Sequence, residues 1–362
     1  MSQATVGAVC AVCGTVAGSG ARFCEACGSD LPGAGSIAPP ASGAPQPAPC
    51  RECGAVVDPD RYCTSCGAKA PRERDHVVEQ PQPWVGAVSD RGLRHDRNED
   101  AMAVDAGDVP GGHAVLVVCD GVSMSQDSDV ASLAAARAAR DVLVGSRARG
   151  LGPDSGLAAI GVHVAAAVEA ASRAVAQVTS PDHGSSPPSC TFVAAVVDRG
   201  RIVTGVVGDS RAYWLPDTGE ARVLTVDDSW AAEQIAAGVP RDQAESGPQS
   251  HALTRWLGVD GPDHAPRVTT MVVQAPGWLV LCSDGLWNYC SPAGDLAALV
   301  ARTAATAAGE PLATASALVD WANGRGGRDN ITVVLARLGT DPDLDSAPAA
   351  SVSSELQTGS ST

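Results

Sequence analysis

Large aromatic side chains and lysine are scarce in this sequence of 362 residues. Phe, Trp and Tyr together make up 3% of the chain and lysine occurs once, at Lys69, so a hydrophobic core must consist mostly of Ala, Val and Leu. The 25 basic residues are outnumbered by 41 acidic ones, which gives a formal net charge of −16. Such a chain lacks the positive surface that nucleic acids and anionic membranes attract, and we expect neither as a partner.

Long hydrophobic segments are also missing. No apolar run approaches the roughly 18 residues that span a bilayer, and no basic segment followed by an apolar run stands near Met1. We therefore expect a soluble, cytoplasmic protein. The 39 glycines and 25 prolines are too many for the interiors of helices and strands, so we also expect long linkers.

Eight of the twelve cysteines form four CxxC pairs before residue 67. Residues 10–28 (CAVCGTVAGSGARFCEACG) align with residues 50–67 (CRECGAVVDPDRYCTSCG) as two copies of one module, with glycine after every pair. Two CxxC turns supply the four thiolates of a tetrahedral zinc site and leave no position open for a substrate, so we expect two structural zinc ions. The predicted ligands are Cys10, Cys13, Cys24 and Cys27 for the first zinc, and Cys50, Cys53, Cys63 and Cys66 for the second.

A disulfide scaffold is the alternative for these cysteines. We favour zinc because a chain without a secretion signal is expected in a reducing compartment. Residues 1–70 carry four basic and five acidic side chains, so they lack the charge of a nucleic-acid binder, and we expect a protein partner instead. The arrangement resembles the double zinc ribbon modules attached to many prokaryotic regulatory proteins.

Changes in composition divide the chain into segments. Stretches of Pro, Ala, Gly and Ser cannot form a core and predict linkers or a tail, whereas the apolar runs after Trp84 predict a large folded domain. The predicted segments are zinc ribbons at 1–30 and 50–70, linkers at 31–49 and 71–83, a folded domain at 84–339 and a disordered tail at 340–362.

Inside the large domain, short Val-rich runs that end in Asp or Gly predict strands, and Ala-rich segments between them predict helices. Two of the strands are separated only by residues 198–200, which predicts an antiparallel hairpin and excludes a purely parallel sheet. The pattern indicates an α+β layered domain. The predicted strands lie within 113–121, 191–200, 201–210, 277–285 and 330–338, and the predicted helices within 128–144, 156–177, 295–308 and 311–321.

Carboxylates stand at or near several strand ends. Asp120 and Asp284 follow apolar strands, Asp329 precedes one, and Asp100 follows Glu99 in the sequence RNEDA. A single Asp-Gly is typical of a turn, but four such sites facing one cleft would hold Mg²⁺ or Mn²⁺, which prefer oxygen ligands. The remaining cysteines lie in or beside apolar strands without the Cys-x5-Arg loop of cysteine-based phosphatases, and we expect them to be packing residues. They are Cys119, Cys190, Cys282 and Cys290.

Seven short motifs occur in an order that resembles the metal-dependent type-2C Ser/Thr protein phosphatase family. The motifs are SDRGLRHDRNEDA (89–101), VLVVCDG (115–121), GDSRAYWL (208–215), LTVDDS (224–229), LTRWLG (253–258), LCSDGLWN (281–288) and RDNITVV (328–334). The resemblance covers nearly all of 84–339. It implies a four-layer αββα sandwich, in which two antiparallel sheets are flanked by helices and preceded here by the two small zinc-ribbon modules.

The resemblance also implies a binuclear Mn²⁺ or Mg²⁺ centre and a role for each ligand. Asp120 would bridge the metals, the carbonyl of Gly121 would join the second, Asp284 and Asp329 would hold the first, and Glu99 and Asp100 would bind directly or through water. A water activated between the metals would attack the phosphorus of phosphoserine or phosphothreonine. The implied substrates are phosphorylated proteins, the products of Ser/Thr kinases, and the zinc ribbons would dock a partner or substrate.

The chain departs from the family pattern at several places, among them the Gly-Thr-Thr segment, which here is Ser189, Cys190 and Thr191. His95 occupies the position where the family usually has an arginine that holds the substrate phosphate, so we assign that role to the adjacent Arg94, with a protonated His95 as the alternative. The family's Met-Gly-Gly after Asp-Gly is replaced by Val122, Ser123 and Met124. These departures leave open a second interpretation, a catalytically weak phosphatase-like module that binds or regulates phosphoproteins.

Overall fold

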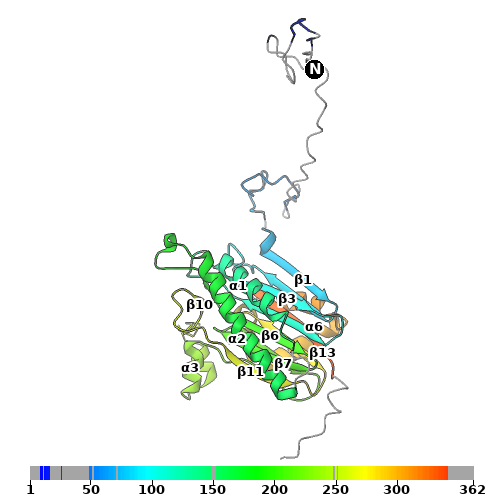
Figure 1. Ribbon diagram of the computed structural model, residues 1–362, viewed down its shortest axis with the longest axis vertical. Helices are drawn as coiled ribbons and strands as arrows, with labels where there is room; N and C mark the ends of the chain where they lie inside the picture. The colour runs from blue at the N-terminus through cyan, green and yellow to red at the C-terminus, as the bar shows by residue number, and fades with distance from the viewer. Residues whose placement is uncertain are drawn as a thin grey trace, which may run out of the picture. The chain divides into compact units, whose positions relative to one another are not determined.

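The computed structural model describes residues 9–10, 12–16, 26, 49–50, 53–70, 72–147, 152–247, 249–250 and 252–340. The chain consists of two units, Met1–Pro71 and Arg72–Thr362. Figure 1 draws the second as a body of sheets and helices. The predicted linker 31–49 and the predicted tail 340–362 lie outside the described residues, except for one residue at the edge of each.

The second unit contains two large sheets whose strands all pair antiparallel. One sheet has six strands in the order β1-β2-β13-β12-β8-β9, and the other has five in the order β11-β7-β6-β4-β3. The first comprises β1 (His76–Gln82), β2 (Val85–Asp90), β8 (Arg211–Pro216), β9 (Arg222–Val223), β12 (Gly277–Cys282) and β13 (Ile331–Leu338). The second comprises β3 (Ala101–Ala106), β4 (His113–Cys119), β6 (Phe192–Asp198), β7 (Arg201–Val207) and β11 (Arg267–Val272).

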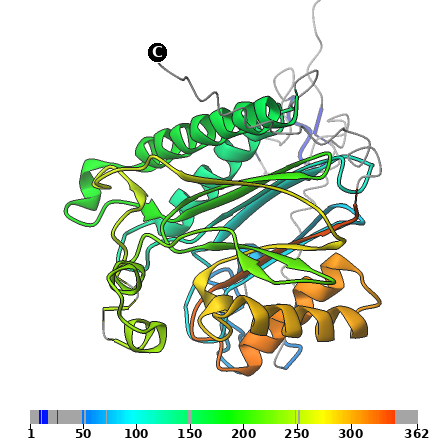
Figure 2. The same cartoon turned by 90° about the horizontal axis from the view of Figure 1, so that it is seen from below.

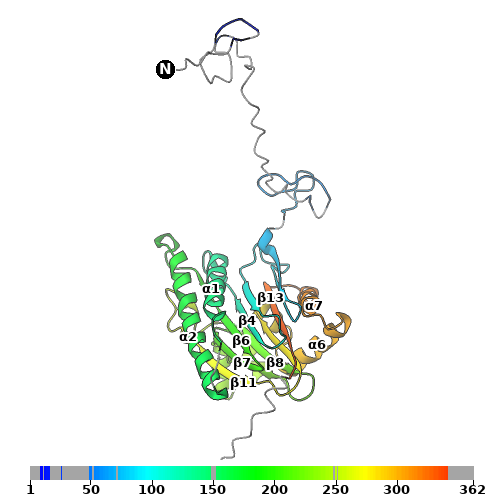
Figure 3. The same ribbon diagram turned by 45° about the vertical axis from the view of Figure 1, so that its right-hand side comes forward.

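Two pairs of helices cover the outer faces of the sheets (Figures 2 and 3). Helices α1 (Ser128–Leu143) and α2 (Pro153–Val178) form a hydrophobic core with the five-stranded sheet, and α6 (Ala293–Thr306) and α7 (Pro311–Gly324) form one with the six-stranded sheet. A third core fills the space between the sheets. This confirms the predicted α+β fold with an αββα sandwich. The short elements are η1 (Glu73–Asp75), η2 (Pro181–His183), β5 (Ser189–Cys190), β10 (Leu257–Gly258), α3 (Trp230–Ala236), α4 (Arg241–Glu245) and α5 (Asp284–Trp287).

The central strands are mostly apolar because both of their faces are covered. Every residue of β4 is buried, and successive side chains point to opposite faces of the sheet. Val115 and Val117 belong to the core beneath α1 and α2, whereas Leu116 and Val118 belong to the core between the sheets. The same arrangement explains why a run of valines rather than an alternating pattern predicted these strands correctly.

The predicted hairpin joins β6 and β7. Asp198 pairs with Arg201, and the two residues between them, Arg199 and Gly200, have φ angles of 49° and 69°. Two positive φ angles are typical of the type I′ turn, which follows the right-handed twist of a β-hairpin. The hairpin prediction is therefore confirmed at the residues on which it was made.

Helix α2 differs from the expectation that no long apolar segment is present. By length and composition its residues Asp154–Val178 could cross a membrane. Within the unit, Val164, Val168 and Val175 of this helix are buried in the core shared with α1 and the five-stranded sheet. A core helix passes the same test of length and composition, so the finding is weak evidence for a membrane span.

The predicted linker at 71–83 and domain start at 84 are wrong, because residues His76–Gln82 form strand β1. β1 lies at the edge of the six-stranded sheet and pairs with β2, with His76 opposite Asp90. Its sequence HVVEQPQ has few apolar residues and includes Pro81. An edge strand tolerates both, because one side of its backbone has no partner strand and one face meets solvent.

A chain that begins at Trp84 is expected to be less stable than one that begins at Arg72. The shorter chain loses β1 and two hydrogen bonds near Asp100, since Arg74 donates to the carbonyl of Asp100 at 2.9 Å and Asn98 donates to the carbonyl of Arg74 at 3.1 Å. We expect its melting temperature, followed by circular dichroism, to be lower by roughly 5 to 15 °C. Equal melting temperatures would show that β1 is not an integral part of the unit.

Candidate metal centre

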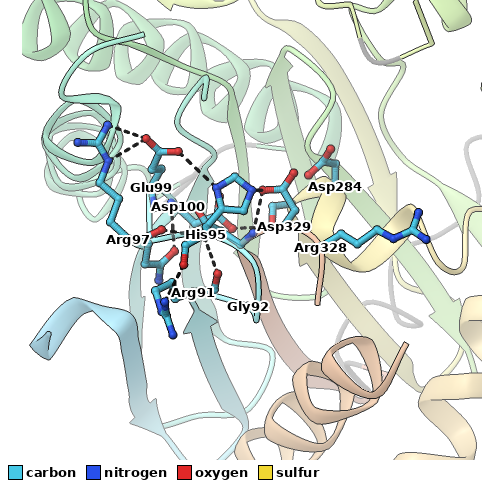
Figure 4. A network of polar contacts seen from close by, with 12 residues as sticks. Arg91, Gly92, His95, Arg97, Glu99, Asp100, Asp284, Arg328 and Asp329 are labelled. Carbon is cyan, nitrogen blue, oxygen red and sulfur yellow. Dashed lines mark hydrogen bonds and ion pairs between the residues drawn. The ribbon is translucent and has the colours of Figure 1, made fainter. Parts of the chain in front are cut away.

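The four predicted aspartates lie at neighbouring strand ends in the second unit. Asp100 immediately precedes β3 and Asp329 lies two residues before β13, whereas Asp120 follows β4 and Asp284 lies two residues after β12. In antiparallel sheets, the start of one strand and the end of its neighbour share one edge. The fold therefore brings together carboxylates that are up to 229 residues apart in the sequence, and Figure 4 shows three of them beside Glu99.

Asp100 is buried and its two carboxylate oxygens differ in their partners. Oδ2 accepts hydrogen bonds from the hydroxyls of Ser283 and Thr332, each at 2.7 Å, whereas Oδ1 is buried without a partner among the described residues. Burial, with the charge of Asp329 as a smaller cause, raises the pKa of Asp100 to about 6. A buried carboxylate oxygen without a donor is a suitable ligand for a cation.

Asp120 and Asp284 repel each other and the other carboxylates. Burial raises the pKa of both side chains well above the ordinary value, and for Asp120 the charges of Asp100, Asp284 and Asp329 raise it further. Divalent cations would relieve this repulsion. The donor set, which includes the buried Asp100 oxygen without a donor and the mutually repelling Asp120 and Asp284, therefore fits Mg²⁺ or Mn²⁺.

Glu99 is held in place by donors on one side of the cluster. Arg97 donates two hydrogen bonds to Oε1 of Glu99, at 2.9 and 2.7 Å, and the hydroxyl of Ser128 donates a third at 2.6 Å. Its backbone N–H donates to the side chain of Asn330 at 2.8 Å. Because Oε1 is occupied by these donors, Oε2 is the oxygen of Glu99 that remains for a cation or a water.

Close packing at two glycines leaves no room for a side chain beside the carboxylates. A Cβ atom at Gly121 would lie 2.7 Å from the carbonyl oxygen of Glu99 and 2.9 Å from the Cβ of Ser128. A Cβ at Gly285 would lie 1.9 Å from the carbonyl oxygen of Asn330. The glycines after Asp120 and Asp284 are thus required by the close approach of a second chain segment. This steric requirement explains the two Asp-Gly pairs in addition to the turn that such a pair typically forms.

Asp209 also belongs to the cluster, although it is absent from the predicted ligands. It lies between β7 and β8 in the motif GDSR, and its side chain is buried. Burial, followed by the charge of Asp227, raises its pKa to about 7, and its charge is in turn the largest charge effect on Asp284. The signal was available in the sequence, because Asp209 follows the buried strand β7 just as Asp120 follows β4.

His95 lies inside the cluster, whereas Arg94 does not. The ring of His95 lies between two carboxylates, with Nε2 at 3.2 Å from Asp329 and Nδ1 at 3.9 Å from Glu99 (Figure 4). Arg94 is exposed, and its side chain contacts none of the predicted ligands in the described part of the chain. The structure thus brings His95, not the predicted phosphate ligand Arg94, into contact with the candidate metal centre.

The carboxylates are more widely spaced than the cysteines of the first unit. Among the described residues, the cluster with all ligand atoms within 4.8 Å of one another is the one formed by Cys50, Cys53, Cys63 and Cys66.

The altered loop after Gly121 forms a turn in which Ser125 donates to the carbonyl of Val122 at 2.7 Å. Met124 in this turn is 88% exposed.

A pocket of about 820 Å³ opens beside the candidate metal centre. Asp329 and Arg328 line one part of it, and residues of α3 and α4 line another. Arg211 forms part of the lining, where it stacks 3.6 Å from the ring of Trp287 and pairs with Asp227 at 2.6 Å. A substrate larger than a phosphate ion therefore has space next to the carboxylates.

The four cysteines of the second unit are mostly buried, as predicted. Cys119, Cys190 and Cys282 have no exposed surface, and Cys290 is half-buried. Burial raises the pKa of the Cys119 and Cys282 thiols, which disfavours the reactive thiolate form. These cysteines pack the core and are poor nucleophiles.

The second CxxC module of the first unit forms a compact group of four sulfur atoms. The Sγ atom of Cys53 lies 3.4 Å from that of Cys63 and 3.5 Å from that of Cys66, and the Sγ atoms of Cys50 and Cys66 are 3.6 Å apart. Four thiolates around one tetrahedral zinc are separated by about 3.8 Å. Backbone N–H groups of Cys66 and Ser65 lower the pKa of Cys63 to about 6, which favours the thiolate that a metal binds. The residues therefore fit zinc.

Three of the four CxxC turns share one backbone geometry. Gly14, Gly54 and Gly67 follow these turns with φ angles of 73°, 75° and 72°, which favour glycine. Each glycine N–H donates to the carbonyl of the first cysteine of its pair, at 2.8 to 2.9 Å. Cys24 and Cys27 lie outside the described residues, so the first zinc site stays a prediction.

Comparisons with known proteins agree with the fold and the motifs. The profile of the family described as Protein phosphatase 2C matches residues 92–322, and that described as Double zinc ribbon matches residues 10–67. The chain is 28% identical over 251 residues to the serine/threonine phosphatase stp of Listeria welshimeri, covering 68% of this chain and 92% of that protein. It is 30% identical over 251 residues to the serine/threonine protein phosphatase PstP of Mycobacterium tuberculosis, covering 69% of this chain and 44% of that protein.

Solved structures show the same architecture. The crystal structure of the Mycobacterium tuberculosis phosphatase PstP/Ppp has a TM-score of 0.53 and 27% identity, and the alignment covers 73% of this chain and all of that one. The serine/threonine phosphatase of S. agalactiae has a TM-score of 0.56 and 25% identity, with coverage of 72% and 100%. The chain therefore belongs to the protein phosphatase 2C family and carries a double zinc ribbon.

Proposed function

We propose that this chain, a protein phosphatase by family, hydrolyses phosphoserine and phosphothreonine in phosphorylated proteins with the help of two Mn²⁺ or Mg²⁺ ions. The observation that carries the proposal is the cluster of strand-end carboxylates, in which Asp100 has a buried oxygen without a donor and Asp120 and Asp284 have raised pKa values. The names of the relatives in Listeria welshimeri and Mycobacterium tuberculosis support serine and threonine as the residue types.

The residues proposed to hold the metals are those of the cluster. When bound, the two cations supply an activated water nucleophile and positive charge near the phosphoryl oxygens. Asp100 is oriented for this role by Ser283 and Thr332, and Glu99 by Arg97 and Ser128. The proposed ligands are Glu99, Asp100, Asp120, the carbonyl of Gly121, Asp284 and Asp329, with Asp209 close to them.

The two zinc ribbons are proposed to bind two structural zinc ions and to dock a partner or a substrate protein. Linkage to a docking module raises the local concentration of a bound substrate without any change at the catalytic site. Zinc–thiolate sites require reduced cysteines, so we propose the cytoplasm as the compartment in which the protein acts.

The test is hydrolysis of a phosphothreonine peptide and of p-nitrophenyl phosphate by the full chain and by Arg72–Thr362. We expect turnover by both chains with Mn²⁺ or Mg²⁺ and none with a chelator, because the carboxylates bind no substrate phosphate without cations. Docking by the ribbons predicts equal activity of the two chains on p-nitrophenyl phosphate but a lower KM of the full chain for the phosphoprotein that the ribbons bind.

The same experiment decides on the second candidate, a phosphoprotein-binding module with weak catalysis. The observation that favours this candidate is His95, which occupies the cluster at 3.2 Å from Asp329. Metal binding by calorimetry without turnover of either compound would overturn the enzyme proposal and support the binding module. Turnover that persists in the chelator would contradict a metal-dependent reaction.

A further inference from the structure

Most arginines around the candidate metal centre are paired with a carboxylate. Such an arginine stays in place through its ion pair, and its charge is already compensated before a substrate arrives. The pairs and their N–O distances are Arg97 with Glu99 at 2.7 Å, Arg211 with Asp227 at 2.6 Å, and Arg241 with Glu245 at 2.5 Å.

Arg328 differs from these arginines. Its side chain is exposed, and its guanidinium has no hydrogen-bond or ion-pair partner in the described part of the chain. Its backbone is well held, since its N–H donates to the hydroxyl of Tyr289 at 3.1 Å and the ring of Tyr289 packs edge-on against Trp321. Arg328 thus combines a fixed backbone with an uncompensated positive charge.

Arg328 also lies where a substrate would arrive. It directly precedes the proposed metal ligand Asp329, and both residues line the pocket of about 820 Å³. In Figure 4 its side chain extends on the side of Asp284, whereas His95 and Arg97 lie on the opposite side of Asp329. A phosphoryl group that enters from the pocket therefore comes close to Arg328.

The negative charge of the carboxylates explains why a positively charged side chain is needed at the pocket beside Asp329. A phosphomonoester carries up to two negative charges, and the carboxylates around Asp120 and Asp284 repel it unless cations compensate them. A guanidinium is planar and donates two parallel hydrogen bonds to two phosphate oxygens. Arg94 is exposed as well, but it does not line the pocket.

We propose that Arg328 binds the phosphoryl group of the substrate from the pocket side of the candidate metal centre. This inference rests on the proposed phosphatase function and gives it a phosphate-binding residue in place of Arg94. Arg328 acts with the cations in holding the phosphoryl oxygens, and its fixed backbone keeps its side chain at the pocket that Asp329 also lines.

The experiment compares Arg328→Ala and Arg328→Lys with the wild type, each as the full chain in Mn²⁺. For Arg328→Ala we expect the KM for p-nitrophenyl phosphate and the inhibition constant of inorganic phosphate to rise about 10- to 100-fold, as for the loss of a charged hydrogen bond. Lysine keeps the charge but not the two parallel donors, so Arg328→Lys should recover part of the loss. A fluorescein-labelled peptide with a difluoromethylene phosphonate in place of phosphothreonine measures binding by anisotropy without turnover, and its Kd should rise in parallel.

Arg325→Ala is the matched control, because Arg325 lies three residues away, stacks over Trp321 and does not line the pocket. It should leave KM and phosphate inhibition unchanged. The inference would be overturned if Arg328→Ala left KM and phosphate inhibition unchanged, or if only Arg94→Ala weakened them. Activity of the wild type would still support the proposed function in that case. If the wild type hydrolyses no phosphoester, the proposed function fails, and the phosphonate peptide still decides whether Arg328 binds the phosphoryl group.

Discussion

Asp120→Asn is expected to abolish metal-dependent phosphatase activity, with a fall in kcat of about 10³-fold or more. The charges of Asp100, Asp284 and Asp329 all raise the pKa of Asp120, so cations bound here would compensate its charge together with theirs. Asparagine has nearly the same shape but no charge, and it is a poor ligand for two cations at once. Release of phosphate from a phosphothreonine peptide, followed with Mn²⁺ and with Mg²⁺, measures the effect.

The stability of the Asp120→Asn variant provides a second readout. Because burial and neighbouring charges raise the pKa of Asp120, its ionised form destabilises the metal-free fold at neutral pH, and asparagine removes this cost. We expect the metal-free variant to melt at a higher temperature than the metal-free wild type, with a smaller increase on addition of Mn²⁺. Asp141→Asn, at a side chain 66% exposed on α1, is the control and should behave like the wild type. Full activity of Asp120→Asn would contradict the assignment of the centre.

The strands that the sequence predicted are buried on both faces, although the buried strands β2, β3 and β8 were not predicted. The runs that became β4, β6, β7, β12 and β13 are rich in Val, Leu and Ala because they lie between a helix layer and another sheet. β1 was missed because an edge strand has one solvent-facing side and little need for apolar residues. β11 is the equivalent edge of the other sheet, and its sequence RVTTMV is mostly exposed.

The grouping of the carboxylates was predictable in part. Strand-end carboxylates such as Asp120 and Asp284 have a recognisable sequence context, and the fold gathers them as expected. Asp209 has that context too, but the prediction relied on a resemblance that assigns it no role. His95 and Arg328 could not be placed, because their position depends on how two loops that are more than 200 residues apart pack against each other. The sequence contains no local signal for such a contact.

Cys63→Ser is expected to remove the zinc from the second module and to unfold it. This module has a small core of Cys50, Val57 and Cys63, so most of its folding free energy must come from the metal. Structural zinc contributes about 10 to 16 kcal/mol in comparable small modules, far more than such a core provides. We expect the zinc content of the purified full chain, measured by plasma mass spectrometry, to fall by one ion per chain. Backbone amides of residues 53–70 should lose their protection in hydrogen exchange.

Cys290→Ser is the control for the cysteine substitution itself, because Cys290 lies in the second unit and outside the sulfur cluster. It should leave the zinc content unchanged. If the wild type instead contained disulfides, its intact mass would be lower by the hydrogens lost, and zinc would be absent before any substitution. Hydrolysis of p-nitrophenyl phosphate should be the same in Cys63→Ser as in the wild type, since the carboxylates lie in a separate unit. A loss of this activity would make the ribbons part of the catalytic mechanism and not only a docking module.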